Sequence, residues 1–268
     1  MTILATSPPL RALSVGRASL WAQQAACAAA VVVVWFVVAR LGVVSGSVLP
    51  RPEEVAGALR DLVVTSDFWA ATWQTLRASV IGLTVALAVA VPAGLITGAY
   101  PLGERLTRMS VDIGRSFPVV ALLPVFLLIF GATQTMECTV VFAACVFPLF
   151  LQAQYGAREV TPAIRETARG YRIPSLLRFR KVVLPSAMPS IMTGLRLAAS
   201  TSVLVSVGVE ILSATPGLGR RLASAQLDGD APQAFAFVFT AAVLGFLVNL
   251  VCQAAERRLL RWRVGQER

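Results

Sequence analysis

The sequence lacks the residue type that most often acts as a catalytic acid or base. It contains no histidine, which excludes histidine-based catalysis and histidine metal sites. Four cysteines lie in or beside apolar runs without a C-x-x-C pair, which is typical of small buried hydrophobic residues rather than of a redox or metal site. The sequence shows no cluster of metal ligands, so we expect the chain to bind no metal or cofactor of its own.

A nucleotide site is also excluded by residue type. A phosphate-binding P-loop needs Gly-Lys followed by Ser or Thr. The only lysine, Lys181, is flanked by Arg180 and Val182. If ATP drives this protein, ATP and Mg²⁺ must therefore be bound by another polypeptide, and some element of this chain must transmit the motion.

An Arg-rich hydrophilic loop over residues 156–190 is the segment best suited to that task. It contains Glu166-Thr-Ala-Arg-Gly-Tyr-Arg172 and ends in Val182-Val-Leu-Pro185, where an apolar run begins. Pro162 and Pro174 divide it into two expected helical segments, 163–172 and 175–183. We expect a short helix that protrudes from a membrane bundle and docks on a soluble partner. On charge alone, an ordinary basic loop that contacts lipid headgroups is the alternative.

Composition indicates an integral membrane protein. The chain is 56% hydrophobic and 14% charged, whereas a soluble domain carries about a quarter charged residues. A net charge of +10 in a soluble protein would suggest nucleic acid as a partner. Here the charges lie between apolar runs, so membrane orientation and headgroup contact explain them better, and we expect no nucleic-acid partner.

Six apolar runs are long enough to cross the roughly 30 Å hydrocarbon core of a bilayer. They cover about residues 21–39, 78–99, 113–130, 139–155, 191–212 and 235–255. Backbone groups in lipid must be hydrogen-bonded internally, so we expect an all-α integral membrane protein with six transmembrane helices in one domain, 1–268. The first run lacks a convincing cleavage site and is interpreted as an uncleaved span.

The distribution of basic residues predicts the orientation. With the N-terminus inside, most of the 24 Lys and Arg residues fall in inside segments. The positive-inside rule then places both termini and the loop 156–190 in the cytoplasm. Outside, Val55, Leu59 and Leu62 share one face of a short amphipathic helix, and the segment 213–234 is expected to dip or turn between spans.

Candidates for a translocation path are the span residues that are polar or that interrupt helices. Prolines free backbone carbonyls and can line a polar path; serines and a carboxylate in the fifth span add polar groups. Glu210 is expected to line an outer vestibule or to pair with Arg220 or Arg221. Arg115 and Arg196 are expected to lie near inner ends and to snorkel, and no paired carboxylates are expected at depth. The path candidates are Pro118, Pro124, Ser202, Ser206 and Glu210.

The Arg-rich loop resembles the EAA signature of ABC importer permeases, which runs Glu-Ala-Ala, three residues, Gly, nine residues and Ile-x-Leu-Pro. Glu166 and Ala168 match its start, and Val182 with Leu184-Pro185 matches its end at the same spacing. The segment Leu49-Pro-Arg-Pro-Glu-Glu-Val55 is similar to the LPSP-x-x-V opening of nitrate, sulfonate and taurine permeases, and segments of the second, third and fifth spans resemble theirs too.

Three positions depart from the family pattern. Arg172 stands where the family has Gly, Thr167 replaces the second residue of Glu-Ala-Ala, and Gln134 lies where Gly-Glu is commoner. Because glycine adopts a positive φ without steric cost, we expect Arg172 to need a different turn geometry.

The resemblance implies a type I ABC importer permease in the inner membrane of a bacterium. It implies a homodimer that works with two ATPase subunits, an extracytoplasmic binding protein and membrane lipids, and cargo such as a sulfonate, taurine, nitrate or an aromatic carboxylate. A self-sufficient secondary transporter or channel is the alternative. The resemblance to ABC importer permeases assigns these residues to the ATPase-coupling loop: Arg165, Glu166, Thr167, Ala168, Arg169, Gly170, Arg172, Leu184 and Pro185.

Overall fold

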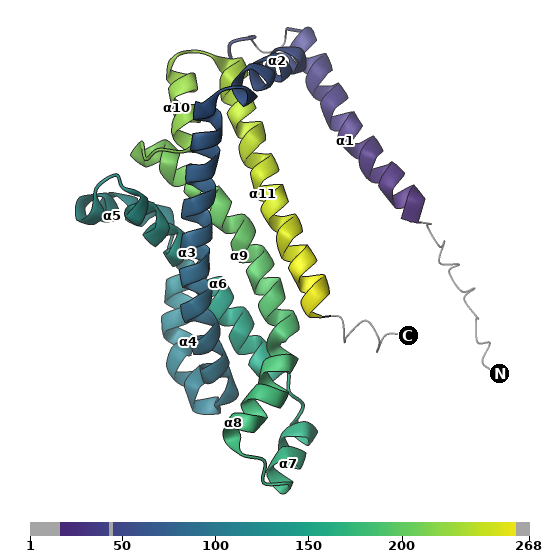
Figure 1. Ribbon diagram of the computed structural model, residues 1–268, viewed down its shortest axis with the longest axis vertical. Helices are drawn as coiled ribbons and strands as arrows, with labels where there is room; N and C mark the ends of the chain where they lie inside the picture. Colours follow the sequence, from purple (N-terminus) through teal and green to yellow (C-terminus); the bar gives the residue numbers. More distant parts are fainter. Residues whose placement is uncertain (1–16, 43–44, 261–268) are drawn as a thin grey trace, which may run out of the picture.

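The computed structural model describes residues 17–42 and 45–260 of the chain, and within them it contains helices and no strands. Long helices run along the molecule, and short helices cap its two ends (Figure 1). Both chain termini, which are predicted to be cytoplasmic, lie outside the described residues. The α-helices are α1 (Arg17–Arg40), α2 (Pro52–Val63), α3 (Ser66–Ala99), α4 (Pro101–Ser116), α5 (Leu123–Phe130), α6 (Gln134–Arg158), α7 (Pro162–Gly170), α8 (Ser175–Arg178), α9 (Leu184–Ser213), α10 (Leu218–Leu227) and α11 (Ala231–Leu259).

Four of the predicted spans coincide with helices that are long and apolar enough to cross a membrane. These helices are Ser66–Ala99, Gln134–Arg158, Ser175–Ser213 and Ala231–Leu259. The third is longer than predicted, because α8, a π-helical segment (Phe179–Val183) and α9 form one continuous helix. In α1, the apolar part, Ala25–Arg40, is shorter than these four. The count of six spans stays a prediction.

The prediction of a continuous span over residues 113–130 is wrong. The chain bends by 78° between α4 and the segment Val119–Phe130, which begins with a 3₁₀ turn at Val119–Leu122. Pro118 explains the break, because proline lacks an N–H group and disfavours helical geometry in the residue before it. Phe117 accordingly has extended backbone angles, φ −79° and ψ 126°. The remaining apolar helix, α5, projects sideways from the bundle (Figure 1).

Small residues bring α3 and α6 close together. Gly94 lies against the backbone of Phe150 and the methyl group of Ala153. Gly98 lies against the backbone of Gln154 and the methyl group of Ala157. Alanines continue this seam towards α9, where Ala198 and Ala199 are buried. In membranes, such small-residue faces allow backbones to approach and gain dispersion contacts. Gly94 and Gly98 therefore serve close packing of α3 against α6.

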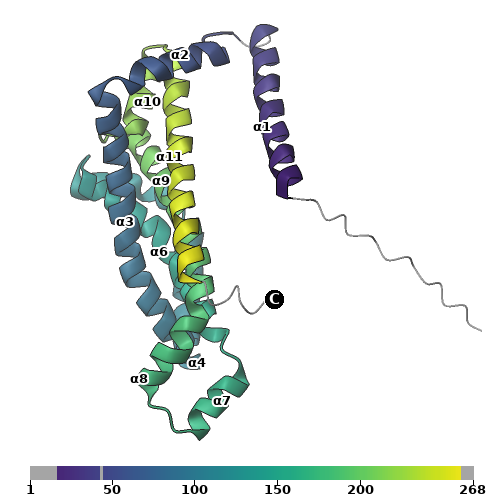
Figure 2. The same ribbon diagram turned by 45° about the vertical axis from the view of Figure 1, so that its right-hand side comes forward.

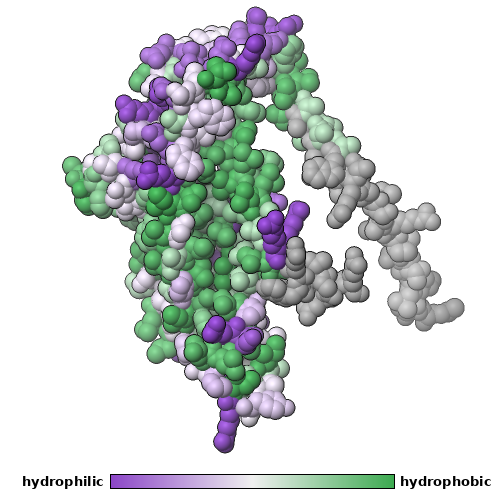
Figure 3. All heavy atoms as spheres, viewed as in Figure 1, coloured by the Kyte–Doolittle hydropathy of each residue, from purple (hydrophilic) through white to green (hydrophobic). Residues whose placement is uncertain are grey.

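One end of the bundle is covered by α2 and α10. The expected amphipathic helix is α2, which buries Val55, and the segment expected to dip or turn instead forms the helix α10. The face seen in Figure 3 is broadly hydrophobic along the long helices and hydrophilic at this end. Both ribbon views place α1 apart from the bundle (Figure 2). The Trp35 indole joins α1 to this end, donating to the carbonyl of Pro50 at 3.2 Å.

Replacement of Gly98 by alanine tests the seam. A Cβ atom there would overlap the Gln154 carbonyl oxygen, so we expect Gly98→Ala to lower the free energy of unfolding by about 1–3 kcal/mol. Thermal unfolding in detergent micelles measures this loss. Gly57 in α2 has no atom within 4 Å of an added Cβ, so Gly57→Ala is the matched control. Equal melting temperatures for the two variants would contradict the tight contact.

Candidate functional site

The helix α7 carries most of the predicted coupling residues and lies beyond the end of the bundle (Figures 1 and 2). Glu166, Thr167 and Gly170 are exposed on it, whereas Ala168 faces inwards with 3% of its surface exposed. Arg165 and Arg169 also belong to α7. The helix therefore offers an exposed polar face at its tip and a small buried residue on its inner side.

A cavity of about 140 Å³ lies beneath α7. Ile164 and Ala168 form its α7 side, and residues of α8 and of the π-helical segment close the opposite side. Because this inner side is incompletely packed, α7 is not locked to the bundle by a dense core. The lining residues are Ala99, Tyr100, Ala157, Val160, Ile164, Ala168, Ser175, Arg178, Phe179, Val182 and Val183.

Arg172 adopts the conformation expected of the glycine it replaces. Its φ is +50°, in the left-handed region. The N–H group of Ile173 donates to the Ala168 carbonyl at 3.0 Å, which closes the end of α7 in the pattern of a Schellman motif. The expectation that Arg172 needs a different turn geometry is therefore wrong. The arginine instead carries the steric cost of a left-handed residue, about 1 kcal/mol.

The Leu184-Pro185 end of the predicted motif lies inside a helix. The π-helical segment Phe179–Val183 immediately precedes Leu184, and the helix continues to Ser213. Proline leaves one carbonyl of the preceding turn without its usual donor, and a π-helical turn accommodates such an interruption. The predicted loop 156–190 is thus shorter, because helical spans occupy both of its ends. The second half of the loop, from Ser175 onwards, and the far end of α9 belong to one continuous helix.

A buried polar junction lies at the other end of α9. The carboxyl group of Glu210, with 0% exposure, accepts hydrogen bonds from the Thr75 hydroxyl and the Gly219 N–H group, both at 2.7 Å. The Thr75 oxygen in turn accepts from the N–H group of Leu218 at 2.9 Å. Gly217 and Gly219 lie directly against Glu210 and leave no room for a Cβ atom. Glu210 therefore holds the start of α10 onto α3 and α9.

These contacts differ from the outer vestibule, or the pair with Arg220 or Arg221, that was expected for Glu210. Arg221 pairs with Asp67 at 2.8 Å instead, and the carboxyl group is buried rather than exposed in a vestibule. Ser202 and Ser206 are also buried, with 1% and 0% exposure, so these three path candidates line no surface of the single chain. Pro118 and Pro124 are exposed at the bend between α4 and α5.

Sequence reasoning missed Glu137, which is 1% exposed and contacts the Ser206 side chain and the Glu210 carboxyl group. Paired carboxyl groups are thus buried in the chain. Glu137 lies in the first turn of α6, so the pair is near the end of a span rather than at its middle. The signal available in the sequence was a carboxylate four residues after the helix-capping Thr133, but its partner on α9 is distant in sequence.

Arg196 also differs from expectation. Instead of extending towards a headgroup, its guanidinium group pairs with Glu256, which joins α9 to α11. Within the described part of the chain, no three His, Cys, Asp or Glu residues form a group that could hold a metal ion.

The comparisons with known proteins all identify transport permeases as relatives. Residues 90–261 match the family described as binding-protein-dependent transport system inner membrane component. The chain is 30% identical to the putative aliphatic sulfonates transport permease protein SsuC of Escherichia coli over 87% of this chain and 88% of that one. It is 30% identical to the taurine transport system permease protein TauC of the same organism, with 87% of each chain covered.

Solved structures show the same fold. An inward-facing form of the MetNI methionine ABC transporter contains a chain that superposes with a TM-score of 0.63 at 18% identity. The match covers 71% of this chain and 96% of that chain.

Removal of the Glu210 side chain tests the polar junction. Glu210→Ala leaves the buried Gly219 N–H group without its acceptor and the Thr75 hydroxyl with only the Ala71 carbonyl at 3.2 Å, so we expect a loss of about 1–3 kcal/mol in unfolding free energy. Thermal unfolding measures it. Asp228→Ala, at the exposed end of α10, is the control and should be close to neutral. A Glu210→Ala protein as stable as the control would show that the junction contributes nothing.

Replacement of Arg172 by glycine tests the turn. Glycine removes the left-handed strain, so we expect Arg172→Gly to slow hydrogen exchange at the end of α7 severalfold. Arg178→Gly, at a helical position with φ −60°, should instead speed local exchange. Faster exchange in Arg172→Gly would mean that contacts of the arginine side chain outweigh the strain.

Proposed function

Because the chain belongs to the family of binding-protein-dependent transport system inner membrane components, we propose that it is the membrane-spanning subunit of an ATP-driven importer of small anions. The family consists of transport permeases, which are not enzymes, and the chain is a multi-pass protein of the bacterial inner membrane with the type I ABC importer fold. The observation that carries the proposal is the protruding helix α7 joined to one continuous helix, Ser175–Ser213.

In this proposal α7 is the coupling helix. Its exposed residues, including Glu166 and Thr167, contact a groove on a separate ATPase subunit, which binds ATP and Mg²⁺. When two ATPase subunits close on ATP, they displace α7 and α8. Since α8 continues through the π-helical segment into α9, the displacement is carried along a helix of 39 residues to the polar junction at Glu210.

A second copy of the chain and a binding protein complete the proposed importer. Two copies enclose the path between them, because the path candidates that are exposed on one chain, Pro118 and Pro124, face outwards from it. An extracytoplasmic binding protein docks at the hydrophilic end formed by α2 and α10 and releases its cargo there.

The proposed cargo is a small organic or inorganic anion. Two relatives are named for aliphatic sulfonates and for taurine, and both of these compounds carry a sulfonate group. A third relative, from Halalkalibacterium halodurans, is named for formylaminopyrimidine transport, at 29% identity over 87% of this chain and 93% of that one. Sulfonates and taurine are the first compounds to test, followed by nitrate and aromatic carboxylates.

A tryptophan on α7 tests the coupling role. We expect Glu166→Trp to abolish co-purification of the ATPase subunit from the native host, because a bulky ring on the exposed face prevents docking. Leu227→Trp is the matched control, since Leu227 is 89% exposed on α10 at the opposite end. Ala168→Trp, on the inner side of α7, should act in the same direction as Glu166→Trp.

Two results would contradict the proposal. One is ATPase co-purification that is equal in Glu166→Trp and Leu227→Trp. The other is full uptake by the purified chain alone in liposomes without ATP, which would make it a self-sufficient transporter.

A further inference from the structure

The helix α4 runs antiparallel to α6, and their contacts define its depth in the bundle. Three contacts join the two helices, and the later a contact comes along α4, the further it lies from the Arg158 end of α6. The Gln154 amide donates to the Thr107 hydroxyl oxygen at 3.1 Å, between the other two contacts. The three contacts are Glu104 with Arg158, Thr107 with Gln154, and Gly114 with the ring of Phe147.

The last turn of α4 is consequently level with the middle of a membrane span. Phe147 lies near the centre of the 25-residue helix α6, about 16 Å from Arg158 at 1.5 Å per residue. Arg115 and Ser116 directly follow Gly114, so they share this level. The expectation that Arg115 lies near an inner end and snorkels is therefore wrong.

A stripe of charged side chains follows this helix to that depth. Arg105, Arg108, Asp112 and Arg115 recur at spacings of three and four residues, which places them on one face, and all four are exposed. Arg115 pairs with Asp112 at 3.1 Å. Within the described residues, neither Arg105 nor Arg108 forms an ion pair, so the stripe keeps a positive charge.

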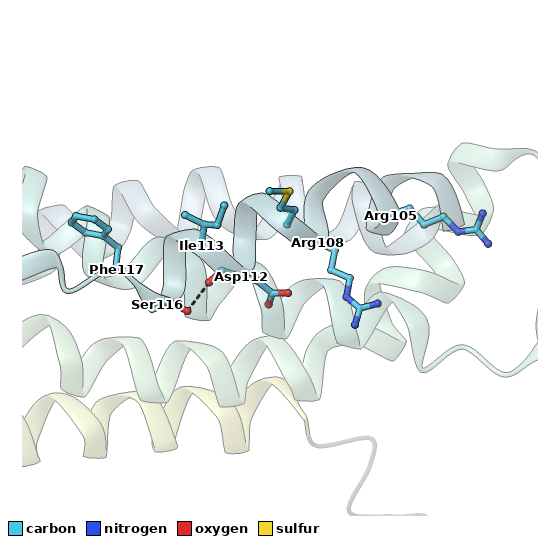
Figure 4. A pocket seen from close by; sticks show the side chains of 7 residues that line it. Arg105, Arg108, Asp112, Ile113, Ser116 and Phe117 are labelled. Atoms are coloured by element: carbon cyan, nitrogen blue, oxygen red, sulfur yellow. Dashed lines mark hydrogen bonds between the residues drawn. The ribbon is translucent and has the colours of Figure 1, made fainter.

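Hollows lie along this stripe on both sides. The larger, of about 710 Å³, is a wide and open depression lined by residues 105–117 alone, which include Arg105, Arg108 and Ser116, with Phe117 at its end (Figure 4). The smaller, of about 300 Å³, lies between α4 and α6 and is predominantly polar. Arg108 and Asp112 line both hollows.

Charged residues at mid-membrane depth do not face lipid, because removing them from water is costly. Exposed charges on a span face a water-filled cavity or a polar partner, and they mark ion and substrate routes. The break at Pro118 adds a second sign, since interrupted helices near the middle of a membrane accompany transport sites.

We infer that the charged face of α4 is a wall of the water-filled translocation path, and that Arg108, with Arg105, forms a transient site for the passing anion. The inference rests on the proposed function for the identity of the cargo as an anion. Asp112 holds Arg115 and offsets its charge, so binding is weak enough for release, as passage requires. A second copy of the chain would supply the opposite wall.

Thiol labelling tests water access and charge without the ATPase or the cargo. A cysteine is placed at Ser116 in a chain whose four native cysteines are replaced by serine or alanine. Inside-out and right-side-out membrane vesicles are treated with an anionic reagent, sulfonatoethyl methanethiosulfonate, and with its cationic trimethylammonium counterpart. Rates are divided by those of each reagent with a free thiol in solution.

Val89→Cys is the matched control. Val89 is half exposed on the apolar face of α3, and the contacts of Gly82 with Val141 and of Gly94 with Ala153 place it level with the middle of α6. If the cysteine-free chain does not fold, labelling of Ser116→Cys and Val89→Cys in the native-cysteine chain is compared with that of the unmodified chain.

We expect Ser116→Cys to react at least tenfold faster than Val89→Cys and to prefer the anionic reagent. The additional substitution Arg108→Gln should reduce that preference severalfold. Reaction as slow as at Val89→Cys would overturn the inference, since α4 would then be dry. Rapid reaction with no anion preference, or with a preference that Arg108→Gln leaves unchanged, would overturn the anion site. Either failure leaves ATPase co-purification, and hence the proposed function, untouched.

Discussion

The close approach of α3 and α6 is the contact on which the rest of the molecule depends. Lipid gives helices no hydrophobic reason to associate, so backbone proximity through glycine and alanine must supply the attraction. Once α6 is set against α3, its Gln154 side chain donates to both Thr97 and Thr107 and thereby places α4 beside the pair. The third member, α9, follows through Ala198 and Ala199. The α7 end, the polar junction and the charged face of α4 are all positioned from this centre.

The helix from Ser175 to Ser213 joins two regions of opposite character. Its first residues border a loosely packed cavity beneath α7, whereas its last turns are held by buried hydrogen bonds at Glu210. A helix that is loose at one end and anchored at the other pivots more readily than it slides. A helix held in this way is suited to transferring a small displacement from a soluble partner to the membrane interior.

Sequence patterns predicted four of the six expected spans, because apolar length is a property of each segment alone. They failed at local changes of backbone direction and where the answer depends on a residue far along the chain. The bend at Pro118 was missed because the run 113–130 is apolar on both sides of it, and hydropathy contains no information about backbone direction. The depth of Arg115 follows from α6, and the role of Glu137 follows from α9. Arg172 was mispredicted because glycine is only the commonest residue at a left-handed turn.

The contact between Glu210 and the turn before α10 also restricts how this protein can change over evolution. Gly217 has an extended backbone, φ 163°, which any residue can adopt. It is restricted because the Glu210 carboxyl group occupies the place of its Cβ atom. A larger residue at position 217 thus becomes acceptable only when residue 210 becomes smaller. Among homologues, positions 210 and 217 should therefore covary rather than change independently.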